Sequence, residues 1–267
     1  NAEAQFNLGN MYYNGDNVKR NYSEAVKWFK KAAGQGHAEA QFNLAIMYYT
    51  GDSIKQNIPE AVKWFKKAAE QGIADAQNNL GTLCHTGDGV KQNYSEAIKW
   101  YRKSAEQGFA KAQFNLGNMY FSGFGTKKDY FEAAKWYAKA AEQGLAEAQF
   151  KMGWMYYSGT GVKQSDSQAI KWYTKAAEQG LPEAQSMLGF IYYYGDGTEK
   201  DYFEAFKWYK KVAEQGDDHA QFMLGLMYFL GQGVLTNDSE GIKWLRIAAR
   251  QDNKDAQEVL QSVGITW

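Results

Sequence analysis

The residues that could support catalysis or metal binding are few and widely separated. Cys84 and His85 are adjacent, and such a pair could provide a thiolate nucleophile with an imidazole base. In a helix, however, adjacent side chains point about 100° apart, so a small buried apolar residue explains Cys84 better. His37 and His219 lie far away in the sequence, and no His, Cys, Asp and Glu cluster has the spacing of metal ligands. We therefore predict no catalytic residue, no metal, no cofactor and no enzyme activity.

Other short motifs are equally weak. Two pairs of glycines faintly resemble phosphate loops, but they follow a predicted helix and lack a Gly-Lys-Ser/Thr sequence; they are Gly123-Phe124-Gly125 and Gly159-Thr160-Gly161. Two Asp-Gly pairs lack the other acidic positions of a calcium loop; they are Asp88-Gly89 and Asp196-Gly197. Three Asn-x-Ser sequons coincide with predicted helix caps, which explain them without glycosylation; they begin at Asn21, Asn93 and Asn237.

The sequence contains seven consecutive copies of one repeat. Tryptophan recurs every 36 residues, at Trp28, Trp64, Trp100, Trp136, Trp172, Trp208 and Trp244. An Ala-Gln dipeptide keeps the same period, with no insertion. Such a period is typical of small units that must stack on their neighbours because none buries a core alone. We predict a single array over residues 1–267, with repeats at about 1–36, 37–72, 73–108, 109–144, 145–180, 181–216 and 217–252 and a partial capping repeat at 253–267.

Each repeat predicts two helices. In the first repeat, residues 2–14 place apolar side chains at helical spacing, and Gly15 suits the left-handed residue that ends a helix. Asn21 and Glu24 form a capping-box pair, in which each side chain satisfies a backbone amide of the other residue, and all seven repeats carry a pair of this type. Gly9 is small enough to let the two helices approach closely. The predicted fold is all-α: a right-handed α/α superhelical solenoid of antiparallel helix pairs, with about 15 helices.

Composition narrows the partners. Thirty Lys and Arg residues balance thirty Asp and Glu residues, so no net field attracts nucleic acid or an anionic membrane. The single cysteine excludes an intrachain disulfide. The sequence has no apolar run of about 18 residues, so it predicts no membrane-spanning helix. The N-terminus also lacks the pattern of a signal peptide, which a longer precursor could carry upstream. We expect no nucleic-acid partner, no membrane insertion and a monomer.

The repeat resembles the Sel1-like repeat, a relative of the tetratricopeptide repeat. The segments that carry the resemblance are Leu8-Gly9, Met11-Tyr12-Tyr13, Gly15, the run from Glu24 to Phe29 and the run from Ala32 to Gly36. The resemblance implies a non-enzymatic scaffold or adaptor for protein assemblies. It also implies a bacterial protein, periplasmic or exported to a host, with roles in envelope signalling or host interaction. A cysteine-rich branch of the family uses one disulfide per repeat, and this chain does not resemble that branch.

Positions that differ between repeats indicate a binding surface. Residues are numbered below by their position in the first repeat; by the resemblance to tetratricopeptide repeats, positions 3, 6, 7, 10, 13 and 14 lie on a concave inner face. Positions 7, 10 and 14 are mostly polar in the first four repeats and mostly apolar or aromatic in the last three, a gradient that a packing role common to all repeats would not produce. We predict that this concave groove binds a protein or peptide. The predicted binding residues are Trp154, Phe190, Tyr194, Met187, Met223, Leu226, Leu230, Asn118, Asn115, Tyr157, Tyr193 and Phe229.

Three other interpretations stay open at this stage. The apolar surface could be covered by a segment outside the chain or by a second copy. Aromatic rings beside Asn amides also suit sugars, so a glycan- or cell-wall-binding module is an alternative function, and a regulatory domain of a larger protein is a third. Trp154, which stands where the earlier repeats have Asn, Ile or Thr, is the first residue that we would substitute.

Overall fold

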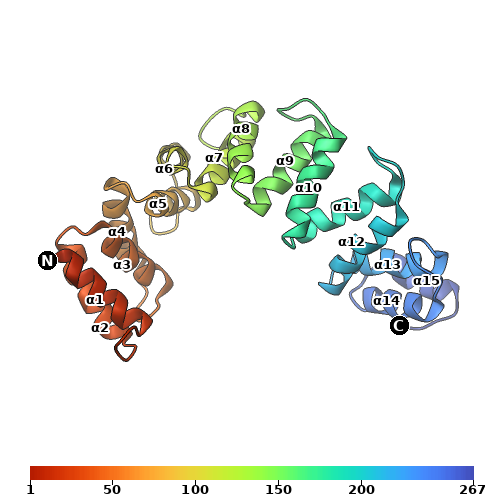
Figure 1. Ribbon diagram of the computed structural model, residues 1–267, viewed down its shortest axis with the longest axis horizontal. Coiled ribbons are helices and arrows are strands. Elements are labelled where there is room, and N and C mark those ends of the chain that lie inside the picture. The colour runs from red at the N-terminus through yellow and green to blue at the C-terminus, as the bar shows by residue number, and fades with distance from the viewer. The chain divides into compact units, whose positions relative to one another are not determined.

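The computed structural model describes residues 1–267 and contains fifteen α-helices and no strand (Figure 1). The all-α solenoid of helix pairs that the sequence predicts is confirmed. The helices are α1 (Ala2–Asn14), α2 (Tyr22–Gly34), α3 (Ala38–Thr50), α4 (Ile58–Glu70), α5 (Ala74–Thr86), α6 (Tyr94–Glu106), α7 (Ala110–Ser122), α8 (Tyr130–Glu142), α9 (Ala146–Ser158), α10 (Asp166–Glu178), α11 (Pro182–Tyr194), α12 (Tyr202–Glu214), α13 (Asp218–Leu230), α14 (Asp238–Ala249) and α15 (Lys254–Ser262).

The helices divide into two compact units, each described below by itself. Unit 1 comprises Asn1–Ala140 and unit 2 comprises Ala141–Trp267. Within each unit, the first helix of a repeat packs against the second, and the second packs against the first helix of the next repeat. These helices are thereby held by their neighbours along the sequence, as a stacked repeat requires.

The start of each second helix is capped as predicted, but only half of the capping box forms. Asn21 Oδ1 accepts a hydrogen bond from the Glu24 amide at 3.1 Å, and the other six repeats cap the same amide with Asn, Asp or Ser. The Glu24 carboxylate does not return to the Asn21 amide, which donates instead to the Tyr12 carbonyl at 2.9 Å. Glu24 pairs with Lys27 one turn on. The backbone bond to the first helix therefore replaces the predicted reciprocal bond and closes the loop between the two helices.

The close approach of the two helices depends on a glycine facing a buried ring. A Cβ atom on Gly117 would lie 2.7 Å from the ring of Tyr137, which is fully buried. Gly81, Gly153 and Gly189 face Tyr101, Tyr173 and Tyr209 in the same way. The contact explains the small residue predicted at this interface.

A chain of buried glutamines links successive repeats in both units. Gln77 is 4% exposed; its Nε2 donates to the Ala69 carbonyl of the preceding repeat at 3.0 Å, and its Oε1 accepts from Gln107 Nε2 at 2.7 Å. The same pair of bonds forms around Gln41, Gln149, Gln185 and Gln221. The Ala-Gln dipeptide is thus a structural requirement: its amide satisfies a carbonyl near the end of the preceding helix.

The tryptophans lie along the second helices and are covered by lysines. Trp100, Trp136 and Trp208 are buried and the other four repeat tryptophans are half-buried. In six repeats a lysine three residues later lies over the indole, with its Nζ 4.0–4.5 Å from the ring centroid. These cation–π contacts shield the indole face from water, which agrees with a packing role for the repeated tryptophans.

Candidate partner-binding surface

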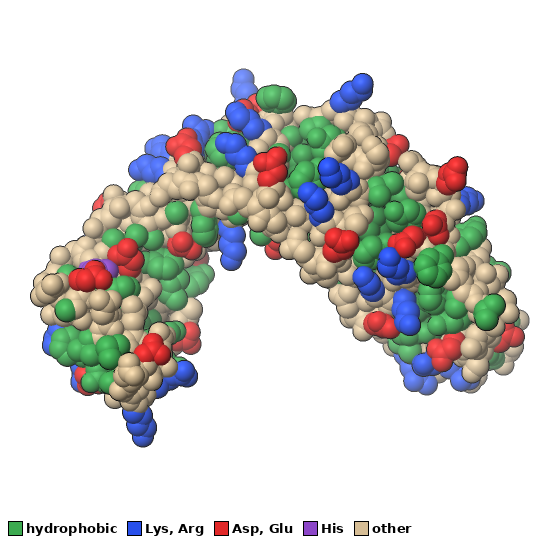
Figure 2. Space-filling model, viewed as in Figure 1, with side chains coloured by type: hydrophobic (Ala, Val, Ile, Leu, Met, Phe, Trp, Pro, Cys, Tyr) green, Lys and Arg blue, Asp and Glu red, His purple; other side chains and the backbone are tan.

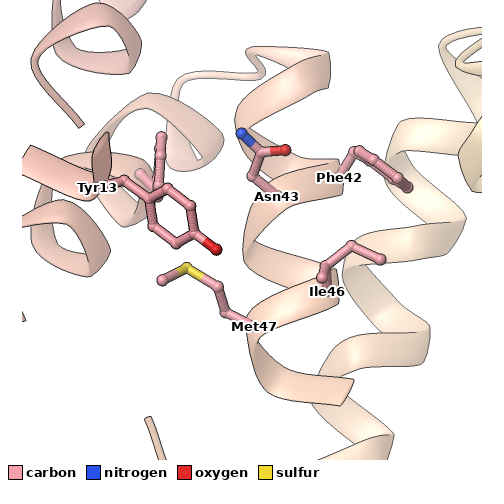
Figure 3. A pocket seen from close by; sticks show the side chains of 6 residues that line it. Tyr13, Phe42, Asn43, Ile46 and Met47 are labelled. Atoms are coloured by element: carbon pink, nitrogen blue, oxygen red, sulfur yellow. The ribbon is translucent and has the colours of Figure 1, made fainter. Parts of the chain in front are cut away.

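Positions 7, 10 and 13 of successive repeats border the same pockets. In unit 1, Tyr13 of α1 faces Asn43 and Met47 of α3 across a pocket of about 230 Å³ (Figure 3). The equivalent Tyr49 borders a pocket of about 190 Å³ with Asn79 of α5. We call the surface formed by positions 7, 10, 13 and 14 of the first helices the first-helix face.

Unit 2 has a larger pocket on the same face. Its volume is about 440 Å³, and it lies among α9, α11, α12 and α13. Tyr157, Met187 and Phe190 occupy positions 13, 7 and 10, as in the pockets of unit 1. Glu183, Ser186, Tyr209 and His219 complete the lining. This unit therefore offers more space and different chemistry at equivalent positions.

Three of the predicted binding residues are large apolar side chains in contact with solvent. Phe190 is 40% exposed, Tyr194 is 51% exposed and Leu230 is 61% exposed. The rings of Phe190 and Tyr194 lie 4.8 Å apart, and Tyr193 approaches Tyr194 at 4.9 Å. These contacts join three side chains of α11 into one aromatic cluster, of which Phe190 and Tyr194 are exposed.

The other predicted residues of unit 2 are less accessible. Trp154, Tyr157, Met187, Tyr193, Leu226 and Phe229 are half-buried. Met223 is 4% exposed and belongs to the core that surrounds Leu224 and Met227. Met223 therefore stabilises unit 2 from inside and is not part of the accessible surface.

The two predicted asparagines of unit 1 are engaged within the chain. Asn115 Nδ2 donates to Asn78 Oδ1 at 2.9 Å, and Asn118 Oδ1 accepts from the Tyr137 hydroxyl at 2.6 Å. Asn78 is buried and stands where most repeats have Phe. A partner would have to compete with these bonds, so the two amides are less available than the sequence pattern predicts.

Position 10 also determines whether a buried tyrosine of the second helix has a hydrogen-bond partner. In unit 1, Thr82 and Asn118 accept the hydroxyls of Tyr101 and Tyr137. In unit 2, Trp154 replaces the acceptor, and the fully buried Tyr173 hydroxyl has no hydrogen-bond partner. Burial raises the pKa of both Tyr137 and Tyr173. The indole at position 10 therefore removes a hydrogen bond that the third and fourth repeats make.

Position 13 tyrosines bond to the loop of the following repeat. The Tyr157 hydroxyl donates to Asp196, and this hydrogen bond, with burial, raises the pKa of Tyr157. Burial, together with a hydrogen bond to Asp88, raises the pKa of Tyr49 in the same way. Asp88 and Asp196, weak candidates for calcium ligands in the sequence, thus have a structural role between repeats.

The rest of the chain carries mixed charge and no candidate metal cluster. Basic and acidic side chains are interspersed over the visible surface (Figure 2). No group of three or more His, Cys, Asp and Glu side chains is placed to hold a metal ion. Cys84 is 7% exposed, and burial raises the pKa of its thiol, which disfavours the thiolate. None of the helices has the length and apolarity needed to cross a lipid bilayer.

Comparisons with known proteins agree on one repeat family. The sequence profile of the Sel1 repeat matches residues 2–37, 38–73, 74–109, 110–145, 146–181, 182–217 and 218–253. No curated protein matches the chain significantly.

Two solved structures are similar over nearly the whole chain. One is described as a protective antigen present in uropathogenic Escherichia coli strains displaying an SLR fold; it is 38% identical, with a TM-score of 0.94 over 97% of this chain and 56% of that one. The present chain thus spans little more than half of that relative. The other, a Sel1 repeat protein from Oxalobacter formigenes, is 34% identical, with a TM-score of 0.80 over 98% and 76% of the two chains. Sel1 repeat proteins are typically non-catalytic scaffolds for protein–protein interaction. The chain belongs to the Sel1 repeat family.

Proposed function

We propose that the chain is a scaffold that binds a protein or peptide on the first-helix face of unit 2. The observation that carries the proposal is the exposure of Phe190, Tyr194 and Leu230 on the first helices of two consecutive repeats. Large apolar side chains left in water cost free energy that burial against a partner recovers. Aromatic anchors beside a pocket are typical of the residues that dominate binding energy.

The contrast with unit 1 supports a binding role over a packing role. Position 14 is Asn14, Thr50 and Thr86 in the first three repeats but Tyr194 and Leu230 in the last two. The framework contacts of the glutamines and glycines are the same in both units. Since the framework does not require an apolar residue at position 14, the apolar residues are free to serve recognition.

The proposed setting is a bacterial protein assembly at the envelope or in contact with a host. The likeness to a protective antigen of uropathogenic Escherichia coli supports this setting, because a protective antigen must be accessible to the host. The proposed partner is a protein, since repeats of this family generally mediate protein–protein interaction.

The test is affinity capture from a bacterial or host extract with matched double variants. We expect Phe190→Ala with Leu230→Ala to lose the partner that the wild-type chain captures, while helical circular dichroism and melting stay unchanged because both side chains are exposed. Asn10→Ala with Thr50→Ala changes the same positions in consecutive repeats of unit 1 and should retain capture.

Two results would refute the proposal. Equal capture by the Phe190 and Leu230 double variant would show that the partner binds elsewhere. A wild-type chain that dimerises, with a double variant that is monomeric, would assign the surface to a second copy of the chain.

A further inference from the structure

The 440 Å³ pocket of unit 2 differs from the unit 1 pockets in charge. Glu183 is the one carboxylate among its lining residues, and it is exposed at the start of α11. The two unit 1 pockets on the first-helix face are lined without a charged residue; their polar lining residues are Asn43, Asn79, Thr82 and the tyrosine hydroxyls. Among the pockets of the first-helix face, only the unit 2 pocket therefore has a charged lining residue that could favour a charged ligand group.

The aromatic rings of this pocket suit a cation. Phe190 and Tyr157 line it from neighbouring repeats, and Phe190 is 40% exposed. Ring faces attract guanidinium and ammonium groups through their quadrupoles. The Tyr157 hydroxyl donates to Asp196, which places a second carboxylate beside the ring and adds to the negative potential.

The pocket also borders Tyr209, which is 1% exposed. Phe190 stands at the position from which Thr82 and Asn118 accept the equivalent tyrosine hydroxyls in unit 1. Phe190 has no acceptor atom.

We propose that this pocket accepts a basic side chain, arginine or lysine, of the partner peptide. The cation lies between the rings of Tyr157 and Phe190 and pairs with Glu183. This assignment rests on the proposed partner-binding function and specifies the chemistry of the partner. His219 of the following repeat borders the same pocket.

The test uses blocked pentapeptides in which a central residue is flanked by two glycines on each side. The central residue is arginine, citrulline or norleucine, so that the first two differ mainly in charge. Binding is followed by NMR of ¹³C-labelled methionine methyl groups. Met187 lines the proposed pocket, and Met47, which lines the unit 1 pocket, is the internal control.

The arginine peptide should shift the Met187 signal saturably and leave Met47 unchanged. We expect citrulline to bind at least about fivefold more weakly, because it lacks the cation–π and ion-pair contributions. Glu183→Gln should weaken arginine binding by about threefold to fivefold. Glu147→Gln, the same position one repeat earlier and outside the pocket, should have no effect.

Four results would overturn the assignment. They are equal binding of the arginine and citrulline peptides, tighter binding of norleucine, no binding of any peptide, and Met187 shifts that depend on protein concentration alone, which would indicate a second copy. If the double variant of Phe190 and Leu230 still fails to capture the partner, the proposed partner binding stands and only the assignment of a basic side chain fails. Capture that survives in that variant would remove the proposed function itself.

Discussion

Units 1 and 2 share one framework but present different side chains on their first-helix faces. In both units a buried glutamine donates to a backbone carbonyl of the preceding helix, and a glycine leaves room for a buried aromatic ring. At position 14, unit 1 is polar throughout, whereas unit 2 has Ser158 followed by Tyr194 and Leu230. The comparison shows that contacts repeated in every copy determine the fold, while the positions that these contacts leave free can carry recognition.

The substitutions with the largest expected effect on stability test whether the frameworks of units 1 and 2 are equivalent. Gln77→Leu in unit 1 and Gln185→Leu in unit 2 each leave a helix carbonyl without its donor and remove one of the two acceptors of a second glutamine. We expect each to lower the free energy of unfolding by about 3 kcal/mol. Urea unfolding followed by circular dichroism measures both values.

The control for this pair is Gln56→Leu. Gln56 is exposed and donates only to the Tyr49 carbonyl, so its loss should cost less than about 1 kcal/mol. Clearly unequal losses of unfolding free energy for Gln77→Leu and Gln185→Leu would contradict the shared framework. The two units would then differ in their internal contacts as well as in their first-helix faces.

Alkaline pH should affect equivalent tyrosines of the two units alike. Burial raises the pKa of Tyr137 in unit 1 and of Tyr173 in unit 2. Above about pH 10 the unfolded chain releases these protons while the folded chain holds them, so stability falls as pH rises from the unfolded pKa through the folded pKa. Tyr137→Phe and Tyr173→Phe should each flatten this fall by up to about 1.4 kcal/mol per pH unit. Urea unfolding at pH 8 and pH 11 gives the slopes; an unchanged slope in either variant would contradict the assignment.

The same two variants should differ at neutral pH. Tyr137→Phe removes a hydrogen bond to Asn118 and should destabilise the chain by about 1 kcal/mol. Tyr173→Phe removes a buried hydroxyl that has no partner and should be neutral or stabilising, by up to about 1 kcal/mol. Urea unfolding at pH 7 separates the two. Equal destabilisation would mean that Trp154 does not deprive Tyr173 of a partner.

Local backbone features were well predicted from the sequence. The period of Trp28 and its equivalents, the Asn21 cap and the helix-ending Gly15 all depend on contacts within one repeat. The reciprocal half of the capping box was wrong, because the Asn21 amide finds the Tyr12 carbonyl first. No local rule reveals that competition, since the carbonyl belongs to the preceding helix.

The candidate site was predicted less completely. The side-chain gradient identified Phe190, Tyr194 and Leu230, which are exposed. It also included Met223, which is buried, and Asn115, whose amide is bonded to Asn78. A gradient of residue types does not distinguish a buried methionine from an exposed one. The Glu183 carboxylate, which distinguishes the unit 2 pocket, was missed because an acidic residue at position 3 is common to most repeats.

The central claim is that a partner binds the first-helix face of unit 2, and site-specific photo-crosslinking tests it directly. A benzophenone amino acid replaces Phe190 in one preparation and Ile46, its equivalent in unit 1, in another. After irradiation in the presence of the captured partner, we predict a covalent complex from position 190 and none from position 46. A complex from position 46 alone, or only a crosslink between two copies of the chain, would contradict the account.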